Sequence, residues 1–127
     1  MYTVGRIDLS VMRAAGFCPL TDEVVLTEAQ LLHIRETHPG VYEQYGQFIP
    51  QVLLDPDDIF EAGQNKKYSA LLTKKVEEAG IPFKHILRLN MPTEPDDYKN
   101  SVITFTRTDE KEIERMRRNK KRLYKRA

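Results

Sequence analysis

The sequence predicts an α+β fold in which N-terminal helices pack on a roughly four-stranded antiparallel sheet and a basic helix ends the chain. Three observations support this prediction. Apolar residues recur at helical spacing in residues 27–54, they alternate at strand spacing in residues 57–108, and a helical pattern returns in residues 109–126. Helices followed by a run of strands are typical of α+β folds with antiparallel sheets.

The length and composition bound the class of protein. The chain has 127 residues, 40% hydrophobic and 31% charged, which fits one domain, with residues 22–126 as its core and residues 1–21 as an N-terminal arm. No apolar run approaches the roughly 18 residues of a membrane span. The first ten residues lack the basic head and apolar core of a secretory signal. Cys18 is the only cysteine, so no internal disulfide can form. We expect a cytoplasmic protein that does not contact a membrane.

The front of the chain predicts short elements before the first clear helix. Residues 3–10 predict a strand or an extended arm, residues 10–17 one or two helical turns, and residues 23–27 a short strand. Thr27 can cap a helix, and Gln30 completes a capping box. That helix is expected to stop near Pro39.

A second helical segment follows, and strands come after it. Residues 41–54 carry apolar residues on one side, and Pro50 is expected to bend or split the segment. Strands are then predicted in the ranges 57–63, 68–77, 81–91 and 101–108. In the third of these, Phe83, His85, Leu87 and Leu89 share one face. His85 is therefore expected to be a core histidine whose ring nitrogens have hydrogen-bond partners.

Two features of the later strands suggest a nucleic-acid partner. In the last strand Ile103 and Phe105 are expected to lie on one face, opposite Val102, Thr104 and Thr106. The sheet face without helices would then carry Lys84, Arg88, Thr104 and Thr106. Such a polar, partly basic face is either an RNA platform or an ordinary solvated sheet face.

The final helix is expected to span residues 109–126. Asp109 can cap it, acids fill its first turn and bases its end, which suits the helix dipole. Ile113, Met116 and Leu123 would form a narrow apolar stripe that docks the helix on the body. Its bases either bind phosphates or form a solvated face.

Charge is divided between the halves of the chain. Residues 1–64 hold 3 basic and 10 acidic side chains, a balance of 3 − 10 = −7, and residues 65–127 hold 17 and 9, a balance of 17 − 9 = +8. Such asymmetry indicates an anionic partner for the basic half. The alternative is that the two halves pack together and neutralise each other.

Two of the three histidines lie in the segment LLHIRETHP, residues 31–39. At about 100° per residue, His33 and His38 lie roughly 140° apart on a regular helix. They therefore cannot bind one metal ion as an i, i+4 pair can, and no compact set of ligands accompanies them. We expect no metal and no cofactor. Since Pro39 disfavours helical geometry at His38, that side chain is expected at the helix end.

The residues needed for metal-free RNA cleavage are all available. A base must take the 2′-hydroxyl proton, an acid must protonate the leaving oxygen, and cations must stabilise the phosphorane. Histidine can give and take protons at neutral pH. Recognisable phosphate-binding loops and nucleophile motifs do not occur. The candidates for this chemistry are His33, Arg35, His38, Lys66, Lys67, Arg88, Thr104 and Arg107.

Three blocks in a fixed order resemble a known family. They are LTEAQLLHIRETHP (26–39), IPQVLLDPDDIFE (49–61) and NSVITFTRTDEKEIERMRRNKKRLYKR (100–126). Together they resemble the phage-associated branch of the barnase–EndoU–colicin–RelE-like (BECR fold) nucleases, over roughly residues 22–126. His33, His38 and Pro39 match the first motif, and Asn100, Ser101 and Thr104 match the last. Where that family has an arginine, this chain has Thr37.

The resemblance implies a metal-independent endoribonuclease of the toxin or phage-effector type. RNA is then the expected partner, and an inhibitor or immunity protein a further one. The protein would act in the cytoplasm, or be delivered to the cytoplasm of a target cell. His38 would be the general acid or base and His33 its partner. Arg88 and the Lys66–Lys67 pair would steady the phosphate, and Thr104 would donate a hydrogen bond. The other expected substrate contacts are Arg35, Lys84, Ser101, Thr106 and Arg107.

Two alternatives stay open. One is a catalytically inactive module on the same fold that binds nucleic acid or an acidic protein, which the departure at Thr37 favours. The other is a phage structural or accessory protein that touches no nucleic acid. Salt-dependent RNA binding would separate the second alternative from the other two functions.

Overall fold

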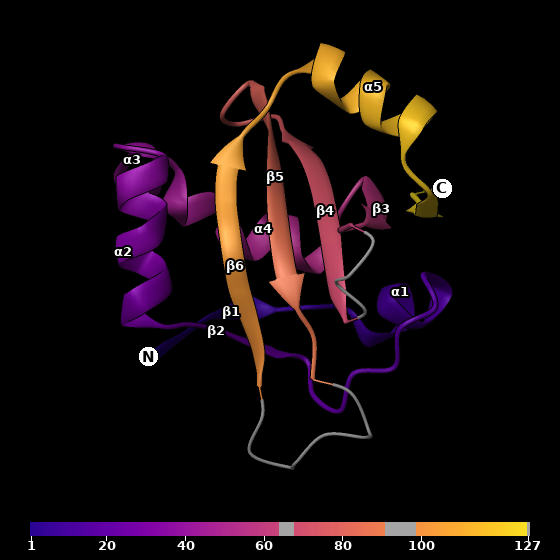
Figure 1. Ribbon diagram of the computed structural model, residues 1–127, viewed down its shortest axis with the longest axis horizontal. Helices are drawn as coiled ribbons and strands as arrows, with labels where there is room; N and C mark the ends of the chain where they lie inside the picture. Colours follow the sequence, from indigo (N-terminus) through magenta and orange to yellow (C-terminus); the bar gives the residue numbers. More distant parts are fainter. Residues whose placement is uncertain (64–67, 91–98, 127) are drawn as a thin grey trace.

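The computed structural model describes residues 1–63, 68–90 and 99–126, and it confirms the α+β class (Figure 1). The strands are β1 (Tyr2–Arg6), β2 (Glu23–Leu26), β3 (Asp58–Glu61), β4 (Ser69–Val76), β5 (Ile81–Arg88), β6 (Asn100–Arg107) and β7 (Arg122–Lys125). The helices are α1 (Leu9–Ala14), α2 (Glu28–Thr37), α3 (Val41–Tyr45), the 3₁₀ helix η1 (Gly46–Phe48), α4 (Ile49–Leu54) and α5 (Glu110–Asn119).

The sheet has more strands than the roughly four that the sequence predicts. Seven strands follow the order β1-β2-β6-β5-β4-β3-β7, within the described residues. The central strands β3 to β6 form the expected antiparallel arrangement. β2 joins β6 in parallel, so the sheet is mixed. The Asn100 side-chain amide donates to the carbonyl oxygens of Thr21 (2.6 Å) and Glu23 (2.9 Å). These hydrogen bonds join β2 to β6, although the two strands are far apart in the sequence.

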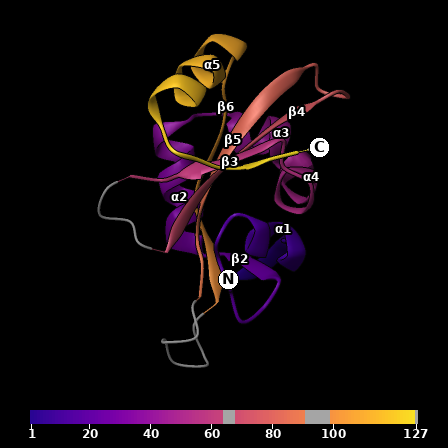
Figure 2. The same cartoon turned by 90° about the vertical axis from the view of Figure 1, so that its right-hand side faces the viewer.

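Helices cover the two faces of the sheet unequally (Figure 2). α1 and α4 lie on one face, above the larger hydrophobic core, and α5 lies over part of the other. The larger core holds Met12 of α1, Val52 and Leu53 of α4, and the strand residues Leu72, Phe83 and Phe105, all almost fully buried. β1 and α1 contribute to this fold, so residues 1–21 are more than an arm.

α2 begins and ends where local sequence predicts. The Thr27 hydroxyl accepts a hydrogen bond from the Gln30 backbone N–H at 3.1 Å. The capping box is only half formed, because the Gln30 side-chain oxygen has no partner in the described residues. Leu31 and Ile34 bury one side of the helix, and α2 runs beside β6 (Figure 1).

The expected second helical segment is split into α3 and α4, with η1 between them. Pro50 lies in the first turn of α4, where its missing N–H would have no intrahelical partner in any case. Pro50 does not split the segment. The regular helix α3 ends at Tyr45, and η1 begins at Gly46, a few residues before Pro50.

The predicted alternation of side chains in the last long strand, β6, is wrong because the strand contains a bulge. Ile86 pairs with Thr104, but Leu87 pairs with Val102, so Ile103 is the extra residue. Val102 and Phe105 both enter the core, with 1% and 0% of their surface exposed, and Ile103 does not. A local pattern could not predict this, because the bulge depends on the pairing with β5.

The last helix is shorter than predicted. α5 ends at Asn119, Lys120 has extended backbone dihedral angles, and residues 122–125 form β7 beside β3. Leu123 consequently packs on the larger core from a strand and does not extend a helical stripe. Most of the expected basic tail is therefore strand and turn, and α5 itself mixes acids in its first turn with bases in its last.

The sheet face expected to be open is partly covered by α5. Ile113 and Met116 of α5 form a second, small core with Phe60 of β3 and Leu71 of β4. Thr106 is only 5% exposed as a result of its position on this face near α5. α5 therefore leaves only part of this sheet face uncovered.

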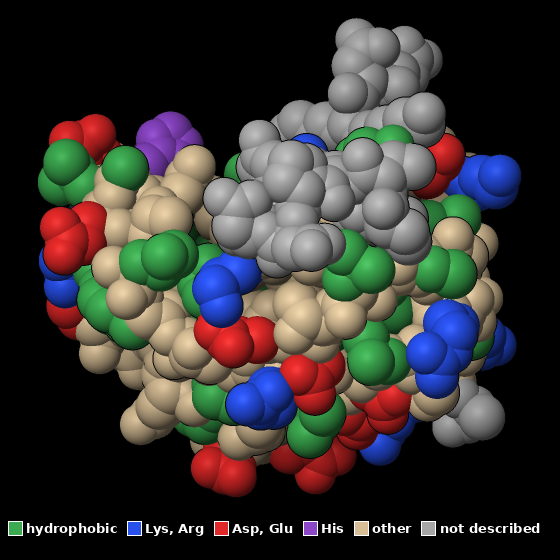
Figure 3. Space-filling model, turned by 90° about the horizontal axis from the view of Figure 1, so that it is seen from below, with side chains coloured by type: hydrophobic (Ala, Val, Ile, Leu, Met, Phe, Trp, Pro, Cys, Tyr) green, Lys and Arg blue, Asp and Glu red, His purple; other side chains and the backbone are tan. Residues whose placement is uncertain are grey.

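The two oppositely charged halves of the chain do neutralise each other in part. Lys74 and Arg126 pair with acids at 55 and 57, Lys99 pairs with Glu23, and two arginines of the second half pair with Asp58. Acidic and basic side chains are interspersed on the face seen in Figure 3. Among the described residues, no helix is long and apolar enough to cross a membrane.

Candidate functional site

His38 lies at the end of α2, where it leaves helical geometry as the following proline favours. Its backbone has φ −134° and ψ 70°, and its N–H still donates to the Ile34 carbonyl oxygen at 2.8 Å. The imidazole is partly buried. Burial lowers the pKa of His38 below its ordinary value of 6.5, and the positive charges of Lys84 and His33 lower it further. At pH 7 this imidazole is neutral and can accept a proton.

Lys84 of β5 points to the same region and is held by α5. Its ammonium group pairs with the Glu112 carboxylate at 2.5 Å, and both side chains are about one quarter exposed. This hydrogen bond lowers the pKa of Glu112. α2 therefore carries a neutral imidazole within electrostatic reach of a cation on β5, and that cation is paired with a carboxylate on α5.

The expected sheet residues lie on the Lys84 face in a known register. Thr106 is opposite Lys84, Thr104 is opposite Ile86, and Ser101 is opposite Arg88. Four residues of strand separate Lys84 from Arg88, which is about 13 Å. Thr104 lies between them, but Arg88 and Ser101 mark the far end of the face. One phosphate beside Lys84 cannot also contact Arg88 without a large movement.

The expected arginines are engaged in other contacts. The Arg88 guanidinium lies 5.8 Å from the centre of the Tyr68 ring and donates to the Leu89 carbonyl oxygen at 2.9 Å. Arg35 pairs with Glu43 at 2.7 Å. Arg107 lies over the Tyr45 ring at 5.8 Å. Arg35 and Arg107 thus contact α3 side chains.

His33 and Thr37 complete the exposed part of α2. His33 is exposed and near enough for its charge to act on His38. Thr37, at the position where the resembling family has an arginine, turns its hydroxyl back to donate to the His33 carbonyl oxygen at 2.8 Å. This side chain therefore adds no positive charge beside His38.

Four further residues singled out from the sequence are Lys66, Lys67, Asn100 and His85. Lys66 and Lys67 lie outside the described residues. Asn100 is fully buried and accepts a hydrogen bond from the Asn90 backbone N–H at 2.9 Å, so it holds the start of β6. His85 lies in the core as expected, with its ring 5.2 Å from that of Phe105, but its ring nitrogens lack the expected hydrogen-bond partners of normal geometry in the described residues.

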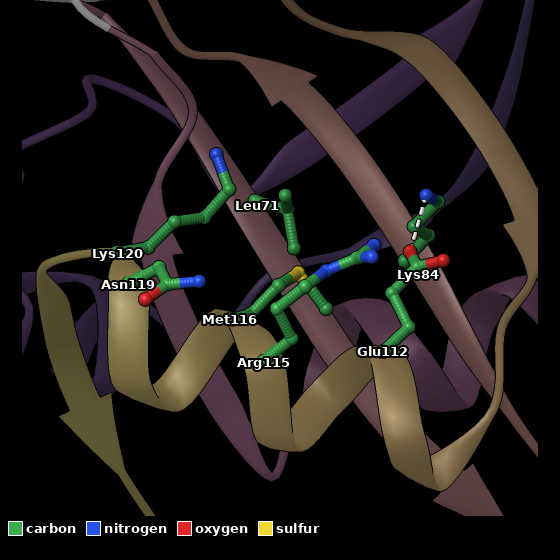
Figure 4. Close-up of a pocket in the computed structure, with 7 residues that line it drawn as sticks. All are labelled: Leu71, Lys84, Glu112, Arg115, Met116, Asn119 and Lys120. Atoms are coloured by element: carbon green, nitrogen blue, oxygen red, sulfur yellow. Dashed lines mark hydrogen bonds and ion pairs between the residues drawn. The ribbon is translucent and has the colours of Figure 1, made fainter.

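Sequence reasoning missed a pocket next to Lys84 (Figure 4). We call it the α5 pocket. It encloses about 290 Å³ and is lined by Leu71, Lys84, Glu112, Arg115, Met116, Asn119 and Lys120. The apolar residues Ile113 and Met116 predicted that α5 docks on the body, but not that it packs on β3 and β4 beside Lys84, so the sequence did not place the pocket residues together. The acids in the first turn of α5 suggested only a helix dipole.

The arrangement suits proton transfer next to an anion. A neutral imidazole can take a proton from a hydroxyl, and a cation beside it can stabilise negative charge that develops on the substrate. In the part of the chain that the structure describes, no group of three or more His, Cys, Asp or Glu side chains is placed to hold a metal ion.

Comparison with known proteins identifies one family. The model of a family described as phage-Barnase-EndoU-ColicinE5/D-RelE like nuclease2 matches residues 18–125. No curated protein and no solved structure matches the chain. The matched range contains α2, the whole central sheet, α5 and every candidate residue discussed above.

Proposed function

The chain belongs to the phage-Barnase-EndoU-ColicinE5/D-RelE like nuclease2 family, and from this premise we propose that it is a metal-independent endoribonuclease whose active site surrounds His38 and Lys84. The observation that carries the proposal is the partly buried His38, whose pKa is lowered by burial and by the charge of Lys84. The family match supports the nuclease class, and this pair supports the chemistry.

The reaction is a transesterification that cleaves the RNA, followed by release of the two fragments. His38 takes the proton of the ribose 2′-hydroxyl, and the 2′-oxygen attacks phosphorus. The bond from phosphorus to the 5′-oxygen breaks, the 5′-oxygen receives a proton from the His33 imidazolium, and a 2′,3′-cyclic phosphate remains. Lys84 stabilises the phosphorane charge, with Glu112 holding its ammonium in position. Thr104 and Thr106 lie on the same sheet face beside it.

Cleavage of total RNA in EDTA tests the proposal. Wild type should produce fragments with 2′,3′-cyclic phosphate and 5′-hydroxyl ends. His38→Ala should lower the rate by about a hundredfold or more, the usual contribution of a general base. Glu36→Ala is the matched control, because Glu36 is an exposed neighbour on α2. Equal rates for wild type and His38→Ala would refute the role of His38.

One observation favours a second function, a catalytically inactive module that binds nucleic acid or an acidic protein. The Thr37 hydroxyl is bonded back into α2, so the charge that the resembling family carries there is missing. In that case wild type would bind RNA in a salt-dependent way and leave it intact in EDTA at every pH.

A further inference from the structure

We propose that the α5 pocket binds one nucleotide of single-stranded RNA, immediately beside the phosphate that is cleaved at His38. The inference rests on the proposed function for the identity of the substrate. It adds a subsite that shares only Lys84 with the catalytic pair, and it assigns a role to the side of α5 that faces the sheet.

The floor of the pocket is apolar and the size is that of a small ligand. Leu71 and Met116 are each 5% exposed, and they form the base of the pocket between β4 and α5. Its volume of about 290 Å³ lies near the lower end of ligand sites, roughly 300 Å³. A flat nucleobase fits such a floor, and a methionine sulfur makes favourable contacts with aromatic rings.

The walls of the pocket carry excess positive charge. Lys84, Arg115 and Lys120 face one acid, Glu112. Glu112 is already paired with Lys84. Within residues 1–63, 68–90 and 99–126, the side chains of Arg115 and Lys120 form no ion pair or hydrogen bond, so both are available to a ligand. Two such cations match the phosphate of a nucleotide, which arginine can bind through two parallel hydrogen bonds.

Asn119 gives the pocket a means to distinguish bases. Its side-chain amide offers a donor and an acceptor together, which can pair with the edge of a base that is not itself base-paired. In Figure 4 Asn119 and Lys120 lie at one end of the pocket, Lys84 and Glu112 lie at the other, and Arg115 and Met116 lie between them.

Lys84 connects this pocket to the proposed catalytic site. The same ammonium group that lowers the pKa of His38 also lines the α5 pocket. At the other end, Asn119 and Lys120 also line a neighbouring pocket of about 270 Å³ with Glu61, Gly63 and Lys121. A strand bound at Lys84 can therefore continue along α5, one nucleotide after another.

A binding measurement with an RNA that cannot be cleaved tests this inference separately from catalysis. The probe is a fluorescent single-stranded RNA with 2′-O-methyl groups throughout, which lack the attacking hydroxyl, and its anisotropy reports binding. The double variant Arg115→Gln/Lys120→Gln should weaken binding by about tenfold. The control Arg13→Gln/Lys125→Gln removes two exposed positive charges outside the pocket and should bind nearly as wild type does.

The same assay distinguishes recognition of a nucleobase from attraction to negative charge alone. When each probe contains a single type of base, Asn119→Ala should reduce the difference in affinity between the probe that binds most tightly and the one that binds most weakly. A glutamate-rich peptide of equal charge should compete far more weakly than an unlabelled probe. Equal competition by the peptide would show an acidic-protein surface and would overturn the nucleotide site.

The two proposals can fail independently. If His38→Ala abolishes cleavage but Arg115→Gln/Lys120→Gln binds the probe as tightly as wild type does, the pocket inference is wrong and the catalytic proposal stands. If the double variant loses binding and wild type leaves RNA intact, the pocket stands and catalysis fails.

Discussion

His38 and His85 are the same side chain in two environments, and burial lowers the pKa of both. His38 is only partly buried and stays open to a substrate at the end of α2, which makes it a usable base. His85 is fully buried within β5, and burial lowers its pKa to about 3. Neither of its ring nitrogens has a hydrogen-bond partner of normal geometry in the described residues. One histidine suits function, and the other makes stability depend on pH.

His85 should make the protein less stable in mild acid. The unfolded chain binds a proton on this residue below pH 6.5, whereas the folded protein does so only near pH 3. The free energy of unfolding should therefore fall as pH decreases between these values, by about 1.4 kcal/mol per pH unit. Urea unfolding at several pH values measures the slope.

The matched variant for that measurement is His85→Leu, which keeps an apolar side chain in the core. Its stability should depend less steeply on pH over the same range, because the titrating group is gone. If wild type and His85→Leu have parallel pH profiles, other groups cause the slope and the assignment to His85 is wrong.

At the scale of elements, Asp58 joins β3, α5 and β7. Its carboxylate accepts hydrogen bonds from Arg117 of α5 at 2.9 Å, from Arg122 of β7, and from the Thr73 hydroxyl at 3.3 Å. The residue is fully buried, and the two arginines are about one third exposed. Asp58 therefore holds α5 against the sheet, and with it the α5 pocket and the carboxylate of Glu112.

Replacing Asp58 should be costly. Asp58→Ala leaves two arginines facing a buried gap, and breaking a buried ion pair on one side costs about 3 kcal/mol or more. The control is Asp22→Ala, which removes an exposed pair with Arg6 and should cost less than about 1 kcal/mol. Guanidinium unfolding compares the two, and equal losses would show that Asp58 does not fasten α5 and β7.

Elements with local signals were predictable, and elements set by distant pairing were not. Thr27 and Pro39 mark the two ends of α2, and the alternation from Phe83 to Leu89 correctly places the core face of β5. The bulge at Ile103 depends on the register with β5. The end of α5 at Asn119 depends on Arg122 reaching Asp58 from a strand, which no local pattern reveals.

The candidate site was predictable to the same extent. The position of His38 at a helix end follows from the next residue, Pro39, and the outward face of Lys84 follows from strand alternation. That Lys84 lies near enough for its charge to act on His38 depends on α2 lying beside β6. Glu112, Arg115 and Asn119 enter the site because α5 folds over β4; the stripe of Ile113 and Met116 predicted that the helix docks, but no local pattern shows which strands it docks on.

At the scale of the whole molecule, the charge asymmetry has two uses. Acids of the first half hold bases of the second, at Asp55, Asp57 and Asp58, and this fixes the C-terminal strand. The bases beyond these pairs, Arg115 and Lys120 among them, line pockets on the side of α5 next to Lys84. Structural neutralisation and an anionic partner, which the sequence presents as alternatives, are therefore compatible: the ion pairs engage one set of bases, and the proposed RNA would engage the other.

The most direct test of the central claim is the rate of RNA cleavage in EDTA as a function of pH, measured beside the NMR titration of the His38 imidazole. The proposal requires neutral His38 and protonated His33, so the rate should rise with pH through the pKa of His38, below the ordinary 6.5, and fall again at higher pH as His33 loses its proton. Replacing Lys84 with methionine should raise that pKa by removing a nearby positive charge. Cleavage that needs an added divalent ion, or a rate that does not follow the titration of His38, would contradict the account.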